Sequence, residues 1–138
     1  MTKTITISMP VADLPASSAF YTALGFENNP AFSGETAALM VWSDTISVML
    51  LTHDRWRGFT DQSIAPSATS RVGLIVSCDS REAVDAMNAL AAAHGGIADI
   101  NPIEDHGFMY TRDFADPDGQ VWGAMWMDPA HAPHRAER

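Results

Sequence analysis

The feature that most constrains the fold is an internal repeat, because the chain runs twice through one strand, one amphipathic helix and three short strands. A unit of this kind cannot bury both faces of its sheet alone, so two units must share a core. The sequence therefore predicts an α+β fold, in which two βαβββ modules form a curved mixed sheet around a cavity with the helices outside. We expect the first set of elements at residues 4–9, 14–24, 26–29, 36–42 and 45–51. The second set is expected at residues 71–77, at a helix that Asp79 or Ser80 caps and that ends before Gly95, and at residues 97–100, 107–114 and 121–127.

Local signals mark where these elements begin and end. Asp13 is a good helix N-cap, and Gly25 is placed to end the first helix. Residues 116–119 read Asp-Pro-Asp-Gly, a strong turn signal that leads into the last strand. Alternate side chains of that strand share a face, so one face would be core and the other, with Gly123 and Met125, could line a pocket. Short strands joined by tight turns imply antiparallel hairpins, and a doubly wound parallel sheet therefore fits less well.

The length and the spacing of these elements predict one domain at residues 1–128, with modules at about residues 3–52 and 71–127. Residues 53–70 connect the modules and form either a linker or a loop that covers a site, because long loops in compact domains are usually one or the other. Residues 129–138 are expected to form a flexible tail, since Pro and Ala surround its two His residues.

The charge balance excludes some partners. The chain of 138 residues has a formal net charge of -9 and a pI near 4.7, so we expect neither nucleic acid nor an anionic membrane surface as a partner. No apolar run approaches the roughly 20 residues that a membrane-spanning helix needs. Cys78 is the only cysteine, and residues 1–4 lack the apolar run of a secretory signal, so we expect a cytoplasmic protein.

Two motifs carry a resemblance to a known family. Pro10-Val11-Ala12-Asp13-Leu14 is followed by Phe20-Tyr21-x-x-Leu24-Gly25-Phe26, and the second half contains Asp116-Pro117-Asp118-Gly119-x-x-Trp122. This pattern resembles the vicinal oxygen chelate superfamily, which includes glyoxalase I, extradiol dioxygenases and bleomycin or fosfomycin resistance proteins. Within it, the chain is most similar to bacterial proteins labelled predicted lactoylglutathione lyase. The resemblance also implies a homodimer.

The resemblance implies where a divalent metal would bind, because metal-dependent members carry His and Glu ligands on the first and last strands of each module. Counting from the two motifs, these places fall at Thr6, near Leu50, at Arg71 and at Gly123. Thr6 is a weak neutral oxygen, and Arg71 would bring a fixed positive charge to a cation site. Leu50 and Gly123 offer no donor side chain. We therefore expect no bound metal and no cofactor, and the sequence assigns no catalytic residue.

Other residues could line a ligand pocket on the cavity side of the sheet. Tyr110 and Arg112 alternate in phase on one strand, where they could hold an anionic or carbonyl-bearing ligand, although a polar face that meets water or a partner subunit fits equally well. Trp56 could close over a ligand or anchor its own loop, and Arg71 could face the cavity or lie at the surface. The predicted ligand-binding residues are Thr6, Ser8, Leu50, Trp56, Arg71, Tyr110, Arg112, Gly123 and Met125.

Three functions are compatible with these patterns, and we favour the first. It is metal-independent binding of a small organic molecule that carries an anionic or polar group near Arg71 or Arg112. The second is a metal-dependent lyase, isomerase or dioxygenase of the same superfamily, whose displaced ligands would come from His53, Glu104, Asp105 and His106. The third is a structural or interaction role, which predicts a filled cavity.

Overall fold

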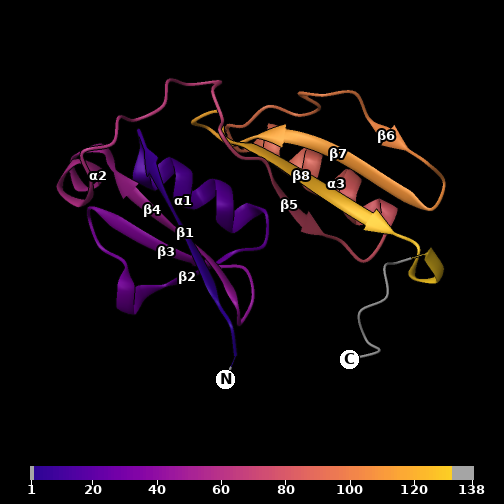
Figure 1. Cartoon of the computed structure of the whole chain (residues 1–138), viewed down its shortest axis with the longest axis horizontal. Coiled ribbons are helices and arrows are strands. Elements are labelled where there is room, and N and C mark those ends of the chain that lie inside the picture. The colour runs from indigo at the N-terminus through magenta and orange to yellow at the C-terminus, as the bar shows by residue number, and fades with distance from the viewer. Residues whose placement is uncertain (1, 132–138) are drawn as a thin grey trace.

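Each half of the chain folds as a βαβββ module, and Figure 1 shows the two modules side by side. The computed structural model describes residues 2–131. The first module contains β1 (Ile5–Val11), α1 (Leu14–Ala23), β2 (Glu27–Asn29), β3 (Ala37–Val41) and β4 (Ile46–Thr52). The second contains β5 (Leu74–Ser77), α3 (Arg81–Ala93), β6 (Glu104–Asp105), β7 (Met109–Ala115) and β8 (Val121–Met127). The predicted α+β fold class is confirmed.

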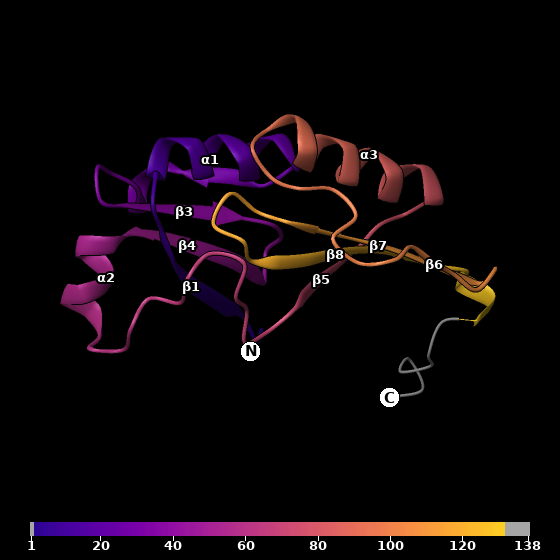
Figure 2. The ribbon, with the colours of Figure 1, turned by 90° about the horizontal axis from the view of Figure 1, so that it is seen from above.

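The strands form two four-stranded sheets, with the orders β1-β4-β3-β2 and β5-β8-β7-β6, so the expected curved sheet is divided into two halves. The first and last strands of each module pair in parallel, and the other pairs are antiparallel. β1 and β5 are therefore edge strands, on the sides where the two sheets meet (Figure 1). Figure 2 shows α1 and α3 together on one side of the sheets, and α2 (His53–Phe59) on the other side at one end. We call the side away from α1 and α3 the open face.

Two elements differ from the sequence prediction. The expected strand at residues 97–100 is reduced to one bridge between Ile97 and Ala115, and the next strand is β6. Asp99 lies at φ 50°, a left-handed conformation that interrupts an extended strand. In the predicted loop, α2 begins because Thr52 Oγ1 accepts a hydrogen bond from the backbone N–H of Arg55 at 3.2 Å. α2 has no buried residue, so it lacks the apolar stripe by which a sequence reveals a helix.

Two short 3₁₀ helices complete the fold. They are η1 (Pro30–Phe32) and η2 (Pro129–His131). The predicted flexible tail includes η2, and its remaining residues, 132–138, lie outside the described part of the chain. None of the helices in residues 2–131 is long and apolar enough to cross a membrane.

The core lies between the helices and the sheets, and aromatic rings carry it from one module to the other. Phe20 and Tyr21 of α1 are fully buried, as is Phe114 of β7. The ring centroids of Phe20 and Phe114 are 6.4 Å apart, and those of Tyr21 and Trp122 are 5.8 Å apart. Trp122 is thus a core residue. Contact across the modules therefore takes place on the helix side of the molecule.

A buried hydrogen-bond network, which we call the module lock, reinforces this contact. The Tyr21 hydroxyl donates to Asp116 Oδ2 at 2.5 Å and accepts a hydrogen bond from Trp122 Nε1 at 3.0 Å. The backbone N–H of Ala12 donates to Asp118 Oδ1 at 2.9 Å, and the Ser17 hydroxyl donates to Asp118 Oδ2 at 3.3 Å. The turn at residues 116–119, which belongs to the second module, is thereby bound to the first.

Replacing Tyr21 by Phe should lower the free energy of unfolding by about 3 kcal/mol, because the buried Asp116 and Trp122 side chains each lose a hydrogen-bond partner. Urea unfolding followed by tryptophan fluorescence measures this change. Thr22→Ala, at an exposed position of α1, is the matched control and should change the free energy by less than about 0.5 kcal/mol. A Tyr21→Phe variant as stable as this control would show that the module lock does not hold the modules together.

Candidate functional site

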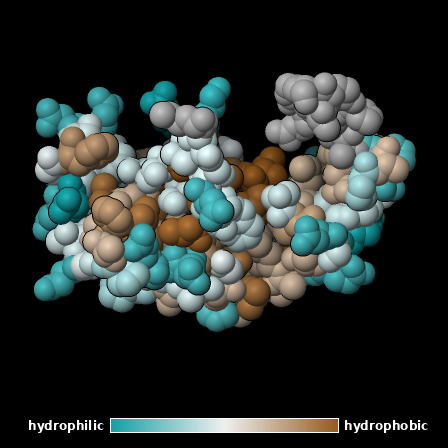
Figure 3. All heavy atoms as spheres, turned by 90° about the horizontal axis from the view of Figure 1, so that it is seen from below, coloured by the Kyte–Doolittle hydropathy of each residue, from teal (hydrophilic) through white to brown (hydrophobic). Residues whose placement is uncertain are grey.

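Two cavities lie between the modules, and Ile7 and Leu74 line both of them. They adjoin along β1 and β5, and together we call them the crevice. The apolar cavity has a volume of about 450 Å³, and its lining includes Ile5, Trp42, Ile46, Ile75, Trp122 and Met125. The polar cavity has a volume of about 370 Å³, and its lining includes Ser8, His53, Thr69, Asp116, Asp118 and Gln120. Figure 3 shows hydrophobic side chains gathered at the middle of the molecule.

The apolar cavity exposes large aliphatic side chains to water. Ile5 keeps 56% of its surface exposed and Ile75 keeps 62%, although both lie on strands. Ile5 is the first residue of β1, and Ile75 alternates with the buried Val76, so it lies on the open face beside Gly123. An organic molecule that fills this cavity would remove the apolar surface from water, which favours binding by roughly 25 cal/mol for each Å² covered.

The polar cavity is bounded by the turn at residues 116–119. Asp116 is almost completely buried, and this burial raises the pKa of its carboxyl group. The backbone N–H groups of Asp118 and Gln120 donate to Asp116 Oδ1 at 2.9 and 2.8 Å, and these hydrogen bonds act in the opposite direction on the pKa. Burial and the Asp116 carboxylate raise the pKa of the Tyr21 hydroxyl well above its ordinary value. Neither Lys nor Arg is among the described residues that line the two cavities.

The alternation of β1 sends Thr6 and Ser8 to the open face, because Met9 points into the core. The register pairs Ser8 with Met49 and Met9 with Leu50. Leu50 is fully buried, so its side chain belongs to the core and not to a ligand pocket. The sequence prediction is corrected at this position, and Met49 takes the place of Leu50 on the open face of β4.

Gly123 is one of the places where the resemblance implies a metal ligand, and a side chain there would have to displace the Asp113 carboxylate. A Cβ atom on Gly123 would lie 2.8 Å from Asp113 Oδ1 and 3.4 Å from Ile75 Cγ1. The Asp113 carboxylate is held in place by Asn101, whose Nδ2 donates to Asp113 Oδ2 at 2.9 Å. Within residues 2–131, no three His, Cys, Asp or Glu side chains are grouped so that they could hold a metal ion. The donor atoms present therefore do not fit the divalent metal of the metal-dependent members.

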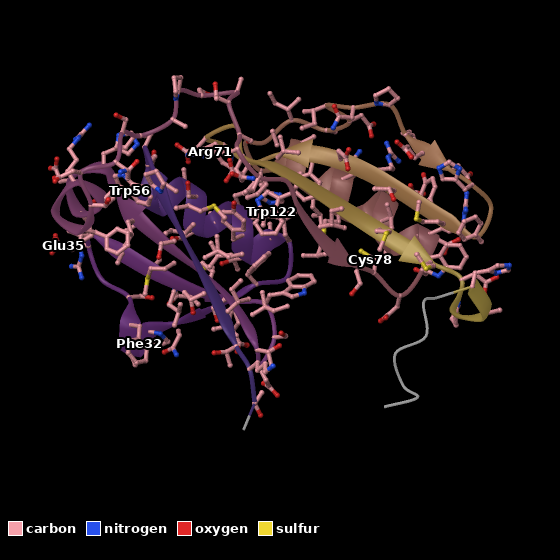
Figure 4. All side chains as sticks on the ribbon, in the orientation of Figure 1. Phe32, Glu35, Trp56, Arg71, Cys78 and Trp122 are labelled. Atoms are coloured by element: carbon pink, nitrogen blue, oxygen red, sulfur yellow. The ribbon has the colours of Figure 1, made fainter. Side chains whose placement is uncertain are left out.

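Arg71 and Trp56 line neither cavity. Arg71 is exposed, and Figure 4 shows it between the modules, where the linker meets the second module. The indole Nε1 of Trp56 donates to the carbonyl of Gln62 at 3.0 Å, and its ring packs against Phe59 with 5.7 Å between centroids. These contacts favour the alternative in which Trp56 anchors its own loop.

Tyr110 and Arg112 point toward α3, on the side opposite to the open face. The Tyr110 hydroxyl donates to Asp85 Oδ1 at 2.6 Å. Arg112 donates to Asp85 at 2.9 Å and to Asp99 at 2.6 Å. Gly123 faces the opposite side of the sheet. The structure therefore does not bring Tyr110 and Arg112 into one pocket with Gly123.

These ion pairs join α3 to the second sheet, and we call them the helix–sheet cluster. The hydrogen bond from Tyr110 lowers the pKa of the Asp85 carboxyl group, and the hydrogen bond from Arg112 lowers it further. The hydrogen bond from Arg112 also lowers the pKa of the Asp99 carboxyl group. Arg81 lies over the Tyr110 ring, 4.3 Å from its centroid, and pairs with Asp105. Each charged side chain of the cluster has an oppositely charged partner within it, which favours a structural role.

The structure thus brings two of the predicted ligand-binding residues, Ser8 and Met125, to the crevice. It also places His53 there, which the sequence suggested as a displaced metal ligand. Glu104 and His106 lie at β6 and line neither cavity, with 3.1 Å between Glu104 Oε1 and His106 Nε2. Sequence reasoning missed the aliphatic residues of the apolar cavity, because a period-two pattern assigns them to the core.

Comparison with known proteins identifies the family. The family model described as the glyoxalase/bleomycin resistance protein/dioxygenase superfamily matches residues 4–123. The chain belongs to this superfamily. The match covers the first module and most of the second, so the resemblance inferred from the two motifs is confirmed at the level of the superfamily. No curated protein matches the sequence.

Several solved structures share the fold of the chain. A hypothetical protein, SA1046 from S. aureus, has a TM-score of 0.76 at 21% identity over 91% of this chain and 94% of its own. A superfamily enzyme from Burkholderia phytofirmans PsJN has a TM-score of 0.74 at 19% identity, with 91% and 99% covered. TnmS3, an antibiotic binding protein from Streptomyces sp. CB03234, has a TM-score of 0.64 at 22% identity, with 92% and 97% covered. At these identities the similarity concerns the fold alone.

Arg112→Gln should lower the free energy of unfolding by about 1 kcal/mol at pH 7 and by less at pH 3. The pKa values of Asp85 and Asp99 are lower in the folded protein than in the unfolded chain. The two carboxylates therefore stabilise the fold fully at a pH above their unfolded-state pKa values. This stabilisation is lost as the pH falls through their folded-state pKa values. Urea unfolding at both pH values measures the difference. Arg57→Gln, which breaks the exposed pair with Asp54, is the control and should have little effect at either pH. An equal loss at pH 7 and pH 3 for Arg112→Gln would contradict the structural role of the cluster.

Proposed function

We propose that this superfamily member binds a small organic molecule in the crevice between its modules, without a bound metal. The observation that carries the proposal is the apolar cavity of about 450 Å³, which is lined by exposed aliphatic side chains and adjoins the polar cavity. Ligand pockets commonly combine apolar walls with a few polar groups and have volumes of about 300–1,000 Å³. Both cavities fall in that range.

The donor chemistry of the open face supports the same proposal. The resemblance implies metal ligands at Thr6, near Leu50, at Arg71 and at Gly123, and none of these residues supplies the imidazole or carboxylate that a metal-dependent member would need. TnmS3, which shares the fold, is described as an antibiotic binding protein. Binding of an organic ligand is therefore a function that this architecture can perform without catalysis. As part of the proposal we place the protein in the cytoplasm, where a single Cys stays reduced, and we expect it to act as a homodimer.

N-phenyl-1-naphthylamine, a neutral probe that fluoresces in apolar surroundings, should bind to the wild-type chain. Ile75→Gln should weaken this binding about tenfold, because an amide replaces an aliphatic wall of the apolar cavity. Fluorescence titration measures the dissociation constant. Ile103→Gln is the matched control, since Ile103 is 47% exposed and lines neither cavity, and it should change the constant by less than about twofold. Equal effects of the two substitutions would place the probe outside the crevice.

The alternative is a metal-dependent lyase, isomerase or dioxygenase with displaced ligands, and His53 in the polar cavity is the residue that favours it. We expect the chain, without an affinity tag, to retain far less than one metal ion after incubation with nickel, zinc, manganese and iron and removal of the excess. The reason is the poor donor set described above. Elemental mass spectrometry measures the metal content. Retention of about one metal per chain, lost in a His53→Ala variant, would favour the alternative and lead to lyase and dioxygenase assays.

A further inference from the structure

We infer that the crevice selects ligands by charge, and that its ligand combines an apolar body with a protonated amine and not with an anionic group. This inference rests on the proposed function, because it concerns the chemistry of the molecule that the crevice holds. It also reverses the expectation from the sequence, in which Arg71 and Arg112 would attract an anionic group.

The charges that line the crevice are negative. Asp116 and Asp118 line the polar cavity, and neither Lys nor Arg is among the described residues that line either cavity. Among the lining residues within the described range 2–131, only His53 could carry a positive charge. Low-dielectric walls focus the field of such charges, so a cation gains and an anion loses free energy on entering.

Both carboxylates are held in fixed positions by the protein. Asp116 accepts from Tyr21 and from two backbone N–H groups, and Asp118 accepts from Ala12 and Ser17. These donors are neutral, so the hydrogen bonds orient the two carboxylates without cancelling their charge. The carboxylates therefore act on a ligand chiefly through their field.

Other groups can bind the polar end of the ligand directly. Among the hydrogen bonds of residues 2–131, none engages the side chains of Ser8, His53 or Thr69. These three side chains line the same polar cavity as the carboxylates. A protonated amine can donate to their oxygen or ring nitrogen acceptors, while a carboxylate ligand would find two Asp residues beside it.

The cations proposed from the sequence do not offset this charge. Arg112 is paired with Asp85 and Asp99 on the other side of the sheet. Arg71 is exposed and lines neither cavity. The whole chain, with its formal net charge of -9, adds to the attraction for a cation.

The two ends of the crevice set the order of groups in the ligand. The apolar cavity, with Trp42 and Ile46, lies on one side of the shared residues Ile7 and Leu74, and the carboxylates lie on the other. A ligand that spans both cavities places its apolar body beside Trp42 and its amine toward Asp118. A free amine and an amine that belongs to a larger molecule satisfy this arrangement equally.

Three probes that share one apolar body test the inference, namely 4-phenylbutylamine, 4-phenylbutanol and 4-phenylbutyrate. Isothermal titration calorimetry at pH 8 and low salt should give the tightest binding for the amine and the weakest for the acid. We expect the dissociation constant of the acid to be about tenfold or more larger than that of the amine. The reason is that the two carboxylates attract the charge of the amine and repel the charge of the acid in a partly buried site. Added salt should reduce this ratio.

Asp118→Asn is the decisive variant, because the amide oxygen can still accept from the Ala12 N–H and the amide NH2 can donate to the Ser17 hydroxyl, while the charge is removed. It should reduce the amine-to-acid ratio several-fold and leave the binding of the alcohol nearly unchanged. Asp13→Asn removes an equal charge at the N-cap of α1, outside the crevice, where Asn also caps well, and it should leave the ratio unchanged.

The outcomes separate the inference from the proposed function. Equal binding of the three probes, tighter binding of the acid, or equal effects of Asp118→Asn and Asp13→Asn would overturn charge selection and leave ligand binding in the crevice intact. Failure of all three probes to bind, together with failure of the neutral naphthylamine, would overturn both. Arg71→Gln gives a further check, since an anion-binding site would lose affinity for the acid in that variant.

Discussion

The hydrogen bond between the Tyr21 hydroxyl and the Asp116 carboxylate is the constraint on which the rest of the structure depends. Tyr21 belongs to the first module and Asp116 to the turn before β8, and both side chains are buried. A buried carboxylate is costly unless donors surround it, so the modules cannot separate at this point without leaving it short of a partner. Because this contact lies on the helix side, it joins the modules there and leaves β1 and β5 unpaired with one another. The crevice is the result.

Sequence reasoning succeeded where the signal is local. The Asp13 side chain caps α1 by accepting a hydrogen bond from the Ala16 N–H, and the turn and period-two pattern before and within β8 located that strand. It failed where the answer depends on which side of a sheet a helix covers. The alternation of β7 indicates that Tyr110 and Arg112 share a face, but only the position of Asp85 on α3 decides which face it is.

The same distinction explains the candidate site. The residue types at Thr6 and Gly123 are visible in the sequence, and they already indicate a poor set of metal ligands. What fills the space at Gly123 is not visible, because Asp113 comes from the neighbouring strand and Asn101 from the segment before β6. Ile5 and Ile75 likewise fit a core pattern, and their exposure becomes visible only in the structure.

The turn at residues 116–119 follows β7, carries the module lock and bounds the polar cavity. A change in this turn alters the fold and the charge of the crevice together, so the polar end can vary only within the limits that stability sets. The apolar end is less limited, because Trp122 belongs to the module lock but Ile5, Ile46 and Ile75 are exposed and lie outside the buried core. Over evolutionary time, a chain of this design can therefore exchange the apolar body of its ligand more readily than the polar group. Diversification would proceed from one end of the crevice while the other end stays fixed.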